Sequence, residues 1–199
     1  MVRADDRARY ETGLFAPKKR QSALWGLYAF NQEVAKTREN VSEPALGEIR
    51  LQWWRDVLLE VQGGHVREHP VVDAIANHLT APDVLKLLEE IIAARALDLY
   101  DDGPTDFDAL KAYAHSVGGA LSEAALRISL QADIDQAVID ATRSCGRAWA
   151  MLGLVRAIPF HWASNRNFIP GDAGKQSLAM QDADEMFRLA EPSIMEMVR

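Results

Sequence analysis

Residues 44–64, PALGEIRLQWWRDVLLEVQGG, carry the pattern that decides the fold. Apolar side chains recur there at the four-residue spacing of one helical face, at Ala45, Ile49, Trp53, Val57 and Val61. Ser42 is a good N-cap and Pro44 suits the first helical turn, while Gly63 and Gly64 favour a C-terminus. We therefore expect a long helix across this stretch.

The same period continues outward in both directions. We expect helices at residues 17–39, 70–79, 82–99, 105–130 and 135–158, and a weaker one at 182–199. Thr105 followed by Asp108 resembles a capping box. The pair at 118–119 is Gly-Gly, which predicts a kink or a close helix contact. Pro159 is expected to end its helix. No segment alternates with period two for long enough to form a strand, so the sequence predicts an all-α bundle.

Composition limits the classes of function. The chain has 199 residues, 48% hydrophobic and 26% charged, which fits one domain over residues 1–199. A net charge of −7 argues against a nucleic-acid partner. The first 20 residues are locally basic, a pattern typical of a solvated helix face or of contact with a diphosphate or an anionic membrane. The polar N-terminus and short apolar runs predict neither a signal peptide nor a spanning helix, and therefore a soluble, cytoplasmic protein.

One segment has an unusual charge distribution. Residues 141–171 contain no Asp or Glu, although the chain has 29, and they carry four arginines and His161. This pattern is typical either of a buried central helix or of a surface that attracts anions. Cys145 is the only cysteine, and its small neighbours suggest a packed side chain. The other histidines show no spacing that suggests a metal site.

Residues 23–30, ALWGLYAF, are similar to the start of the first motif helix of the squalene/phytoene synthase family. Residues 146–170, ending in RNFIP, resemble the second motif helix and the loop after it. Residues 113–119 are similar to a middle segment with an aromatic residue and glycines. The likeness covers nearly the whole chain and implies an isoprenoid-synthase-like helical bundle.

The resemblance also implies two metal-binding motifs. Active members of the family condense two prenyl diphosphates head to head, and carboxylates four residues apart hold the Mg²⁺ ions that help the leaving group ionise. At the first motif this chain reads AKTRE over residues 35–39, and at the second the expected aspartates fall at Ala157 and His161. Polar positions one and two turns earlier fall at Ala150 and Gly153. We therefore expect an anion-attracting helix, no metal site and no cofactor, with Mg²⁺ required only for an active synthase.

Residues 30–35, 44–55 and 154–161 resemble one branch of that family, the phytoene-synthase-like assembly factor of respiratory complex I and its bacterial relatives. This likeness implies assembly of the NADH dehydrogenase complex without catalysis, with a complex I subunit or assembly intermediate as partner. It places the protein in the cytoplasm or peripherally at the inner membrane, on the matrix side in a eukaryote. Two alternative functions remain compatible with the sequence: a synthase acting on farnesyl or geranylgeranyl diphosphate, and a carrier of isoprenoids.

No catalytic residue is expected, but ten residues are expected to line the old prenyl pocket and bind an isoprenoid or prenyl diphosphate. They are Asn31, Arg38, Glu39, Arg50, Gln52, Trp53, Tyr113, Arg156, His161 and Arg166. Several have simpler interpretations. Arg50 can pair with Glu48, Asp56 or another helix, and Asn31 and Gln52 can be buried amides that join two helices.

Family members are usually longer, with further helices after the second motif. We therefore expect either a chain shortened at its C-terminus or a partner that supplies the remaining helices. An open bundle would expose apolar surface, which favours a homo-oligomer or a client protein as its cover.

Overall fold

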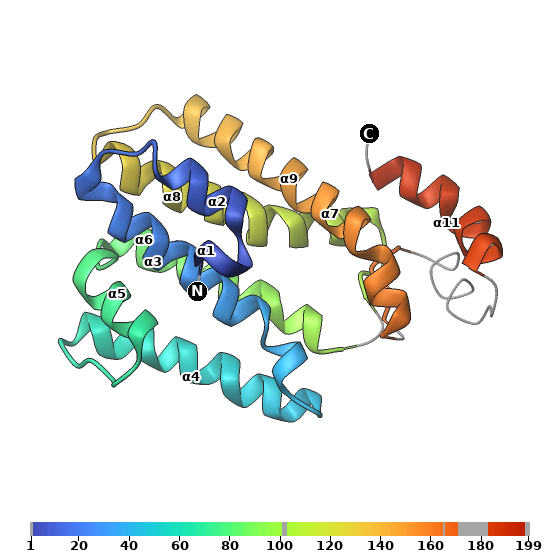
Figure 1. Ribbon diagram of the computed structural model, residues 1–199, viewed down its shortest axis with the longest axis horizontal. Coiled ribbons are helices and arrows are strands. Elements are labelled where there is room, and N and C mark those ends of the chain that lie inside the picture. Colours follow the sequence, from blue (N-terminus) through green and yellow to red (C-terminus); the bar gives the residue numbers. More distant parts are fainter. Residues whose placement is uncertain (1, 101–102, 165, 171–182, 198–199) are drawn as a thin grey trace.

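The computed structural model describes residues 2–100, 103–164, 166–170 and 183–197 (Figure 1). All regular structure in these residues is helical, which confirms the all-α prediction. The elements are α1 (Val2–Asp5), α2 (Arg7–Gly13), α3 (Lys18–Ala35), the 3₁₀ turn η1 (Arg38–Asn40), α4 (Pro44–Gln62), α5 (Pro70–His78), α6 (Pro82–Ala94), the 3₁₀ turn η2 (Arg95–Leu99), α7 (Phe107–Ala114), the π-helical turn η3 (His115–Gly119), α8 (Ala120–Leu130), α9 (Gln136–Ala163) and α11 (Ala183–Met197). No helix among the described residues is long and apolar enough to cross a membrane.

Helices α3, α4, α5, α6 and α8 enclose the main apolar core. Phe30 of α3 meets Trp54 of α4 edge to face, with ring centroids 5.5 Å apart. Gly26 of α3 lets α5 approach closely, because a Cβ there would lie 3.0 Å from that of Ala74. Fully buried side chains from four of these helices fill the space between them, including Leu27, Leu51, Ile75, Leu88, Ile91 and Ile92. Burial of this kind is the main stabilising term of such a bundle.

The predicted helix at residues 44–64 is present as α4, but its buried face differs from the expected one. Ile49 is 66% exposed, whereas Leu51 and Trp54 are buried. A spacing of exactly four residues drifts around a helix of 3.6 residues per turn, so the proposed stripe follows the core only near Val57 and Val61. The N-cap also differs, because Glu43 and not Ser42 precedes the helix.

The segment predicted as one helix over residues 105–130 consists of α7, η3 and α8. Asp106 is the N-cap, accepting a bond from the backbone N–H of Ala109 at 2.8 Å, so the capping box proposed for Thr105 and Asp108 is wrong. The predicted close contact at the glycine pair is confirmed. Gly118 lies directly against Gly146 of α9, and a Cβ on either glycine would overlap the other's carbonyl group.

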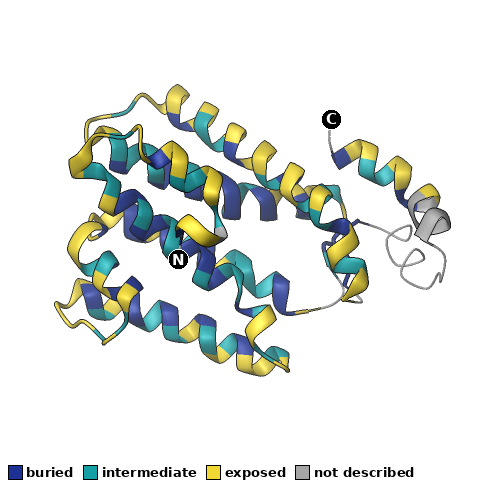
Figure 2. Cartoon of the chain, in the orientation of Figure 1, coloured by how far each residue is buried: buried dark blue, intermediate teal, exposed yellow. Residues whose placement is uncertain are grey.

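Helix α9 differs from expectation in two ways. It continues through Pro159 to Ala163. Pro159 is exposed, and water can bond to the carbonyl that has lost its helical donor. Helix α9 is also not the buried central helix that residues 141–171 suggested, since much of its length is exposed (Figure 2). Cys145, expected to be packed, is likewise exposed.

The C-terminal elements pack on the end of α9. Residues 166–170 are irregular and buried, in line with the loop expected there, and the rest of that predicted loop lies outside the described residues. Helix α11 agrees with the weak helix predicted at 182–199. Its Ala190 and Ile194 contact Ile158 of α9 and Ile169 of the loop. These contacts close the far end of α9.

Candidate functional site

A buried polar cluster lies where η2, α7 and the C-terminal end of α9 meet. We call Arg95, Asp98, Tyr113, His161 and Arg166 the Asp98 cluster. The Tyr113 hydroxyl donates to Asp98 Oδ1 at 2.6 Å. Arg95 Nη1 donates to Asp98 Oδ2 at 2.9 Å and to the Tyr113 oxygen at 2.8 Å. The Asp98 carboxylate therefore joins η2 to α7.

Arg166 adds a second cation to this cluster. Its side chain is buried, its Nη2 donates to the backbone oxygen of Asp98 at 3.1 Å, and its guanidinium lies 5.7 Å from the ring centre of Phe168. No carboxylate of the described residues is within ion-pair distance of Arg166, and its Nε is buried without a hydrogen-bond partner. Asn167 holds the loop in place by bonding both the N–H and the oxygen of Ile169 at 2.8 Å.

His161 completes the cluster on the last turn of α9. Its ring centre lies 4.7 Å from that of Phe168. Burial lowers the pKa of His161, and the nearby Arg166 lowers it further, so the ring is neutral at neutral pH. Its Nδ1 is buried without a partner. The imidazole can therefore accept or donate a hydrogen bond but contributes no charge.

The electrostatics of the cluster favour an anion. Burial alone would lower the pKa of Arg95, but Tyr113 and Asp98 raise it well above its ordinary value, so Arg95 stays charged. Burial raises the pKa of Tyr113, which therefore stays neutral. The cluster then contains two guanidinium groups and one carboxylate, and among the described residues that carboxylate is ion-paired with Arg95 alone. Buried charge without a counter-ion is costly, and an anionic ligand with oxygen acceptors would offset it.

The residues at the two motif positions do not fit Mg²⁺. Ala35 and Ala157 offer no ligand atom, His161 is a nitrogen donor, and Glu39 is exposed on η1. Mg²⁺ prefers several oxygen ligands in near-octahedral geometry. Across the part of the chain that the structure describes, no group of three or more His, Cys, Asp or Glu side chains is placed to hold a metal ion.

Of the ten predicted site residues, Tyr113, His161 and Arg166 come together in the Asp98 cluster. Arg156 is exposed on α9 and does not join them. Asn31 is buried in α3 with its Oδ1 unpartnered, and Arg38 of η1 donates to the oxygen of Val41 at 3.4 Å. The sequence pattern therefore identified one part of the cluster and several residues that lie elsewhere.

The three predicted residues on α4 have local partners. Arg50 pairs with Glu33 of α3 at 3.0 Å, which confirms the simpler expectation of a bond to another helix. Gln52 is exposed and bonds Asp56 at 2.8 Å, so it does not join two helices. Trp53 is half-buried beneath the guanidinium of Arg67, at 5.4 Å from its ring centre.

Sequence reasoning missed Arg95 and Asp98, the centre of the cluster. The sequence feature that could have identified them is their spacing: an Arg and an Asp lie three residues apart at the end of the predicted helix at residues 82–99, which is otherwise rich in apolar side chains. A carboxylate within an apolar stripe is a candidate for a buried and paired group.

A second charged cluster fixes α9 to α6 and α8. Arg143 donates to both oxygens of Glu90, at 3.1 and 2.9 Å, and to Glu123. Glu123 also pairs with Arg127 at 2.6 Å. Burial would raise the pKa of Glu123, but hydrogen bonds from Arg143 and Arg127 outweigh it and lower the pKa below the ordinary value. These groups satisfy one another, so we assign this cluster a structural role.

Comparison with protein families gives one match that spans the chain. The family described as "Squalene/phytoene synthase" matches residues 2–194. A solved structure, described as "Crystal structure of a dehydrosqualene synthase in complex with ligand", superposes with a TM-score of 0.76 over 98% of this chain and 70% of that chain. Its sequence identity is 17%, so the likeness supports the isoprenoid-synthase fold alone.

Curated relatives share one printed name, "NADH dehydrogenase (ubiquinone) complex I, assembly factor 6". The Bos taurus protein is 28% identical over 181 residues, covering 86% of this chain and 51% of the relative. The Homo sapiens protein is 27% identical with the same coverage. A homolog from Dictyostelium discoideum is 23% identical over 148 residues, covering 73% of this chain and 41% of its own length. The chain thus spans about half the length of the curated relatives it matches.

Proposed function

The chain belongs to the squalene/phytoene synthase family, and from this membership we propose that it acts without catalysis in the assembly of respiratory complex I. The observation that carries the proposal is the similarity, over 86% of this chain, to proteins named as complex I assembly factors. The proposed partner is a complex I subunit or an assembly intermediate. The proposed place of action is the inner membrane surface, on the matrix side in a eukaryote.

The two motif positions support a non-catalytic role. Ionising a prenyl diphosphate requires a counter-charge for the departing diphosphate, which active synthases obtain from metal ions held by carboxylates. Here Lys36 and Arg38 follow Ala35 at the first motif, and Ala157 and His161 stand at the second. Cations beside the first motif would repel Mg²⁺. Among the described residues at these two motifs, Glu39 is the one carboxylate, which supports a role that does not depend on that chemistry.

The Asp98 cluster supports a retained binding function. Arg166 brings a buried cation without a carboxylate partner, and Arg95, His161 and Arg166 each have a buried nitrogen without a bond. We propose that this end of the bundle holds an anionic ligand, such as a prenyl diphosphate, without turning it over. Mass spectrometry of the purified protein tests this idea: a co-purifying isoprenoid supports it, and a protein that neither carries nor binds one contradicts it.

Deletion of the gene in the source organism tests the assembly role. We expect lower NADH dehydrogenase activity and accumulation of partly assembled complex I on native gels, both restored by the wild-type gene. R166A should restore less than wild type, while R156A, which removes an exposed arginine from the same helix-and-loop region, should restore fully. Normal complex I levels in the deletion strain would refute the assembly role.

A turnover assay tests the absence of catalysis separately. Farnesyl or geranylgeranyl diphosphate is incubated with the protein and Mg²⁺, and the products are separated by chromatography. We expect no product above the protein-free control. Steady formation of a C30 or C40 hydrocarbon would show that the chain is an active head-to-head synthase.

A further inference from the structure

The turn between α2 and α3 presents an unusually exposed aromatic side chain. Phe15 is 91% exposed, and its neighbour Leu14 is 48% exposed. Both lie in the short connection between Gly13 and Lys18. Large apolar side chains on a free surface are costly in water when they adjoin one another, and such a pair is typical of a contact site.

The backbone of this turn is already hydrogen-bonded. The N–H groups of Leu14, Phe15 and Ala16 donate to carbonyls of α2 at 3.1 Å. The side-chain amide of Gln21 donates to the oxygens of Leu14 and Ala16, at 3.1 and 3.0 Å. Pro17 has no N–H to satisfy. Most backbone polar groups of this turn are thus paired internally, so the turn loses few bonds to water when it enters an apolar medium.

Positive charge lies directly beside the apolar pair. Lys18 and Lys19 are exposed on the first turn of α3, and Arg20 is half-buried. That turn has no acidic residue, and no side chain caps it, so the positive end of the helix dipole adds to the field. The protein as a whole carries a net charge of −7. The basic turn is therefore a local exception on an acidic molecule.

Other groups at this end of the bundle are partly apolar and partly acidic. Leu130, 54% exposed at the end of α8, lines the same groove as Thr12, Gly13 and Ala16. The α2–α3 turn and the α8–α9 connection lie at the same end of the molecule (Figure 1). That connection carries Asp133 and Asp135, while Glu11 of α2 is paired with Arg7 at 2.7 Å.

We propose that the α2–α3 turn docks the protein peripherally on an anionic lipid bilayer. Leu14 and Phe15 enter the headgroup region, and Lys18 and Lys19 contact the lipid phosphates and carboxylates. The combination of an inserted aromatic side chain with adjacent lysines is how peripheral proteins gain both apolar and electrostatic attraction to a membrane. An anionic surface would repel the acidic groups, Asp133 and Asp135 at the same end included, so the bundle would turn the α2–α3 turn rather than the α8–α9 connection toward the lipid. The inference does not depend on the assembly role.

Vesicle sedimentation with the purified chain tests the proposal. Phosphatidylcholine vesicles containing phosphatidylserine are compared with pure phosphatidylcholine vesicles. We expect binding to the anionic vesicles that falls with added salt. F15S should weaken binding to the anionic vesicles about tenfold, because one inserted aromatic side chain is lost. K18A/K19A should weaken the binding about twenty-five-fold, at roughly a fivefold loss for each lysine.

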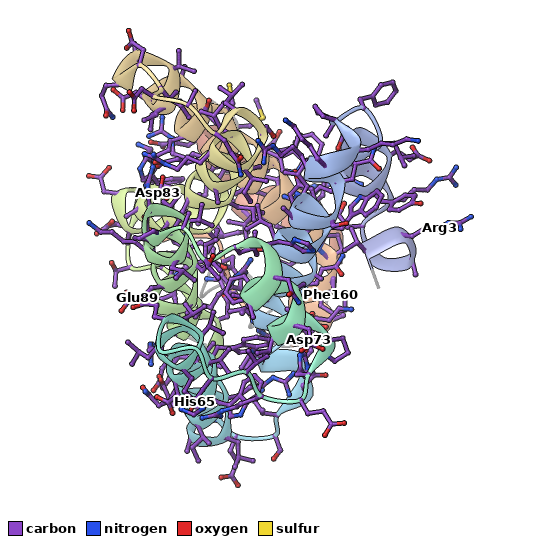
Figure 3. All side chains as sticks on the ribbon, turned by 90° about the vertical axis from the view of Figure 1, so that its left-hand side faces the viewer. Arg3, His65, Asp73, Asp83, Glu89 and Phe160 are labelled. Carbon is purple, nitrogen blue, oxygen red and sulfur yellow. The ribbon has the colours of Figure 1, made fainter. Side chains whose placement is uncertain are left out.

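The matched control is F160S. Phe160 of α9 is also exposed, at 55%, and lies away from the turn (it is labelled in Figure 3). F160S should bind vesicles like wild type, and all variants should keep the wild-type melting temperature. Equal wild-type binding to both kinds of vesicle, or wild-type binding by F15S, would overturn the proposal. Loss of complex I assembly in F15S without any vesicle binding by wild type would assign the turn to a protein partner instead.

Discussion

The main core and helix α9 are stabilised by different means. In the core around α3, α4 and α6, large side chains such as Phe30, Trp54 and Leu88 are fully buried. In α9, whose 28 residues make it the longest helix described, Trp149 and Leu152 are instead about half exposed. Figure 2 shows this contrast as buried colour along the core-facing helices and exposed colour along α9.

Helix α9 is held by a close backbone contact and by charge. The glycine crossing of Gly118 and Gly146 brings η3 and α9 together, and Arg143 ties α9 to Glu90 and Glu123. The core therefore depends on apolar volume. The first half of α9 depends more on the glycine contact and on charged groups, while its second half also packs apolar side chains such as Met151 and Ile158 against α7, the loop and α11. The comparison teaches that an apolar sequence does not by itself make a buried helix.

The largest effect is expected at the glycine crossing. G118V would place a side chain against the Gly146 carbonyl and the Ala150 Cβ, and backbone atoms cannot yield as a flexible side chain can. We expect a loss of about 4 kcal/mol or more in unfolding free energy, above the usual cost of overpacking. G153A is the control, because nothing lies within 4 Å of its Cβ position. It should be neutral or stabilise by up to about 1 kcal/mol, as measured by urea denaturation.

Leucines in the two regions should respond differently to truncation. L88A removes a fully buried side chain and should cost about 3 kcal/mol through lost burial and a residual cavity. L152A removes a side chain of α9 that is 46% exposed, and should cost less than about 0.5 kcal/mol. The same urea denaturation checks both. Similar losses for the two variants would contradict the proposed contrast, because they would mean that the exposed face of α9 contributes as much apolar packing as the core.

The charged cluster should give a smaller, pH-dependent effect. In E123Q, Arg143 keeps its pair with Glu90 and Arg127 keeps its pair with Asp83. We therefore expect the unfolding free energy to fall by about 2 kcal/mol, which is less than the loss when an isolated buried ion pair is broken. The folded-state pKa of Glu123 lies below its ordinary value of 4.5. Its stabilisation is therefore complete above that value and lost as pH falls through the folded-state pKa. Thermal melts at acid pH should show a weaker pH dependence for E123Q than for wild type.

The smallest effect is expected at Tyr113. Y113F removes the hydroxyl that bonds Asp98 and Arg95 but leaves the Arg95–Asp98 ion pair in place, so the unfolding free energy should fall by about 1 kcal/mol. Because burial raises the folded-state pKa of Tyr113 above 10.0, wild type should lose stability as pH rises above that value. Y113F should lose less over the same alkaline range. An identical alkaline profile for the two proteins would show that Tyr113 does not titrate with unfolding.

Much of the fold could be predicted from local sequence. Helical period, prolines at helix starts and glycine pairs identify the helices well, because these signals act over a few residues. The buried face of a helix is harder to predict than its position, and α4 shows why. Both Ile49 and Leu51 are apolar, and only the placement of neighbouring helices buries one and exposes the other. Pro159 likewise could not be placed from sequence, since its cost depends on exposure to water.

The candidate site could be predicted only in part. Tyr113 and Arg166 were found because they lie in segments that resemble a family motif. Asp98 was missed because its importance comes from contacts 15 and 68 residues away along the chain. Long-range pairing of this kind leaves little trace in a single sequence. Arg156, chosen by motif position, faces outward because α9 is not covered there.

The π-helical turn η3 has a consequence for how this molecule tolerates changes in length. Such a turn is equivalent to one surplus residue taken up within an otherwise continuous α-helix. Removing one residue from positions 115–117, before the Gly118 contact, would thus leave α7 and α8 facing their present neighbours. Removing one residue from the start of α8 would instead turn Glu123 by about 100° around the helix axis, away from Arg143. The same deletion is absorbed at one point and misaligns the helix a few positions later.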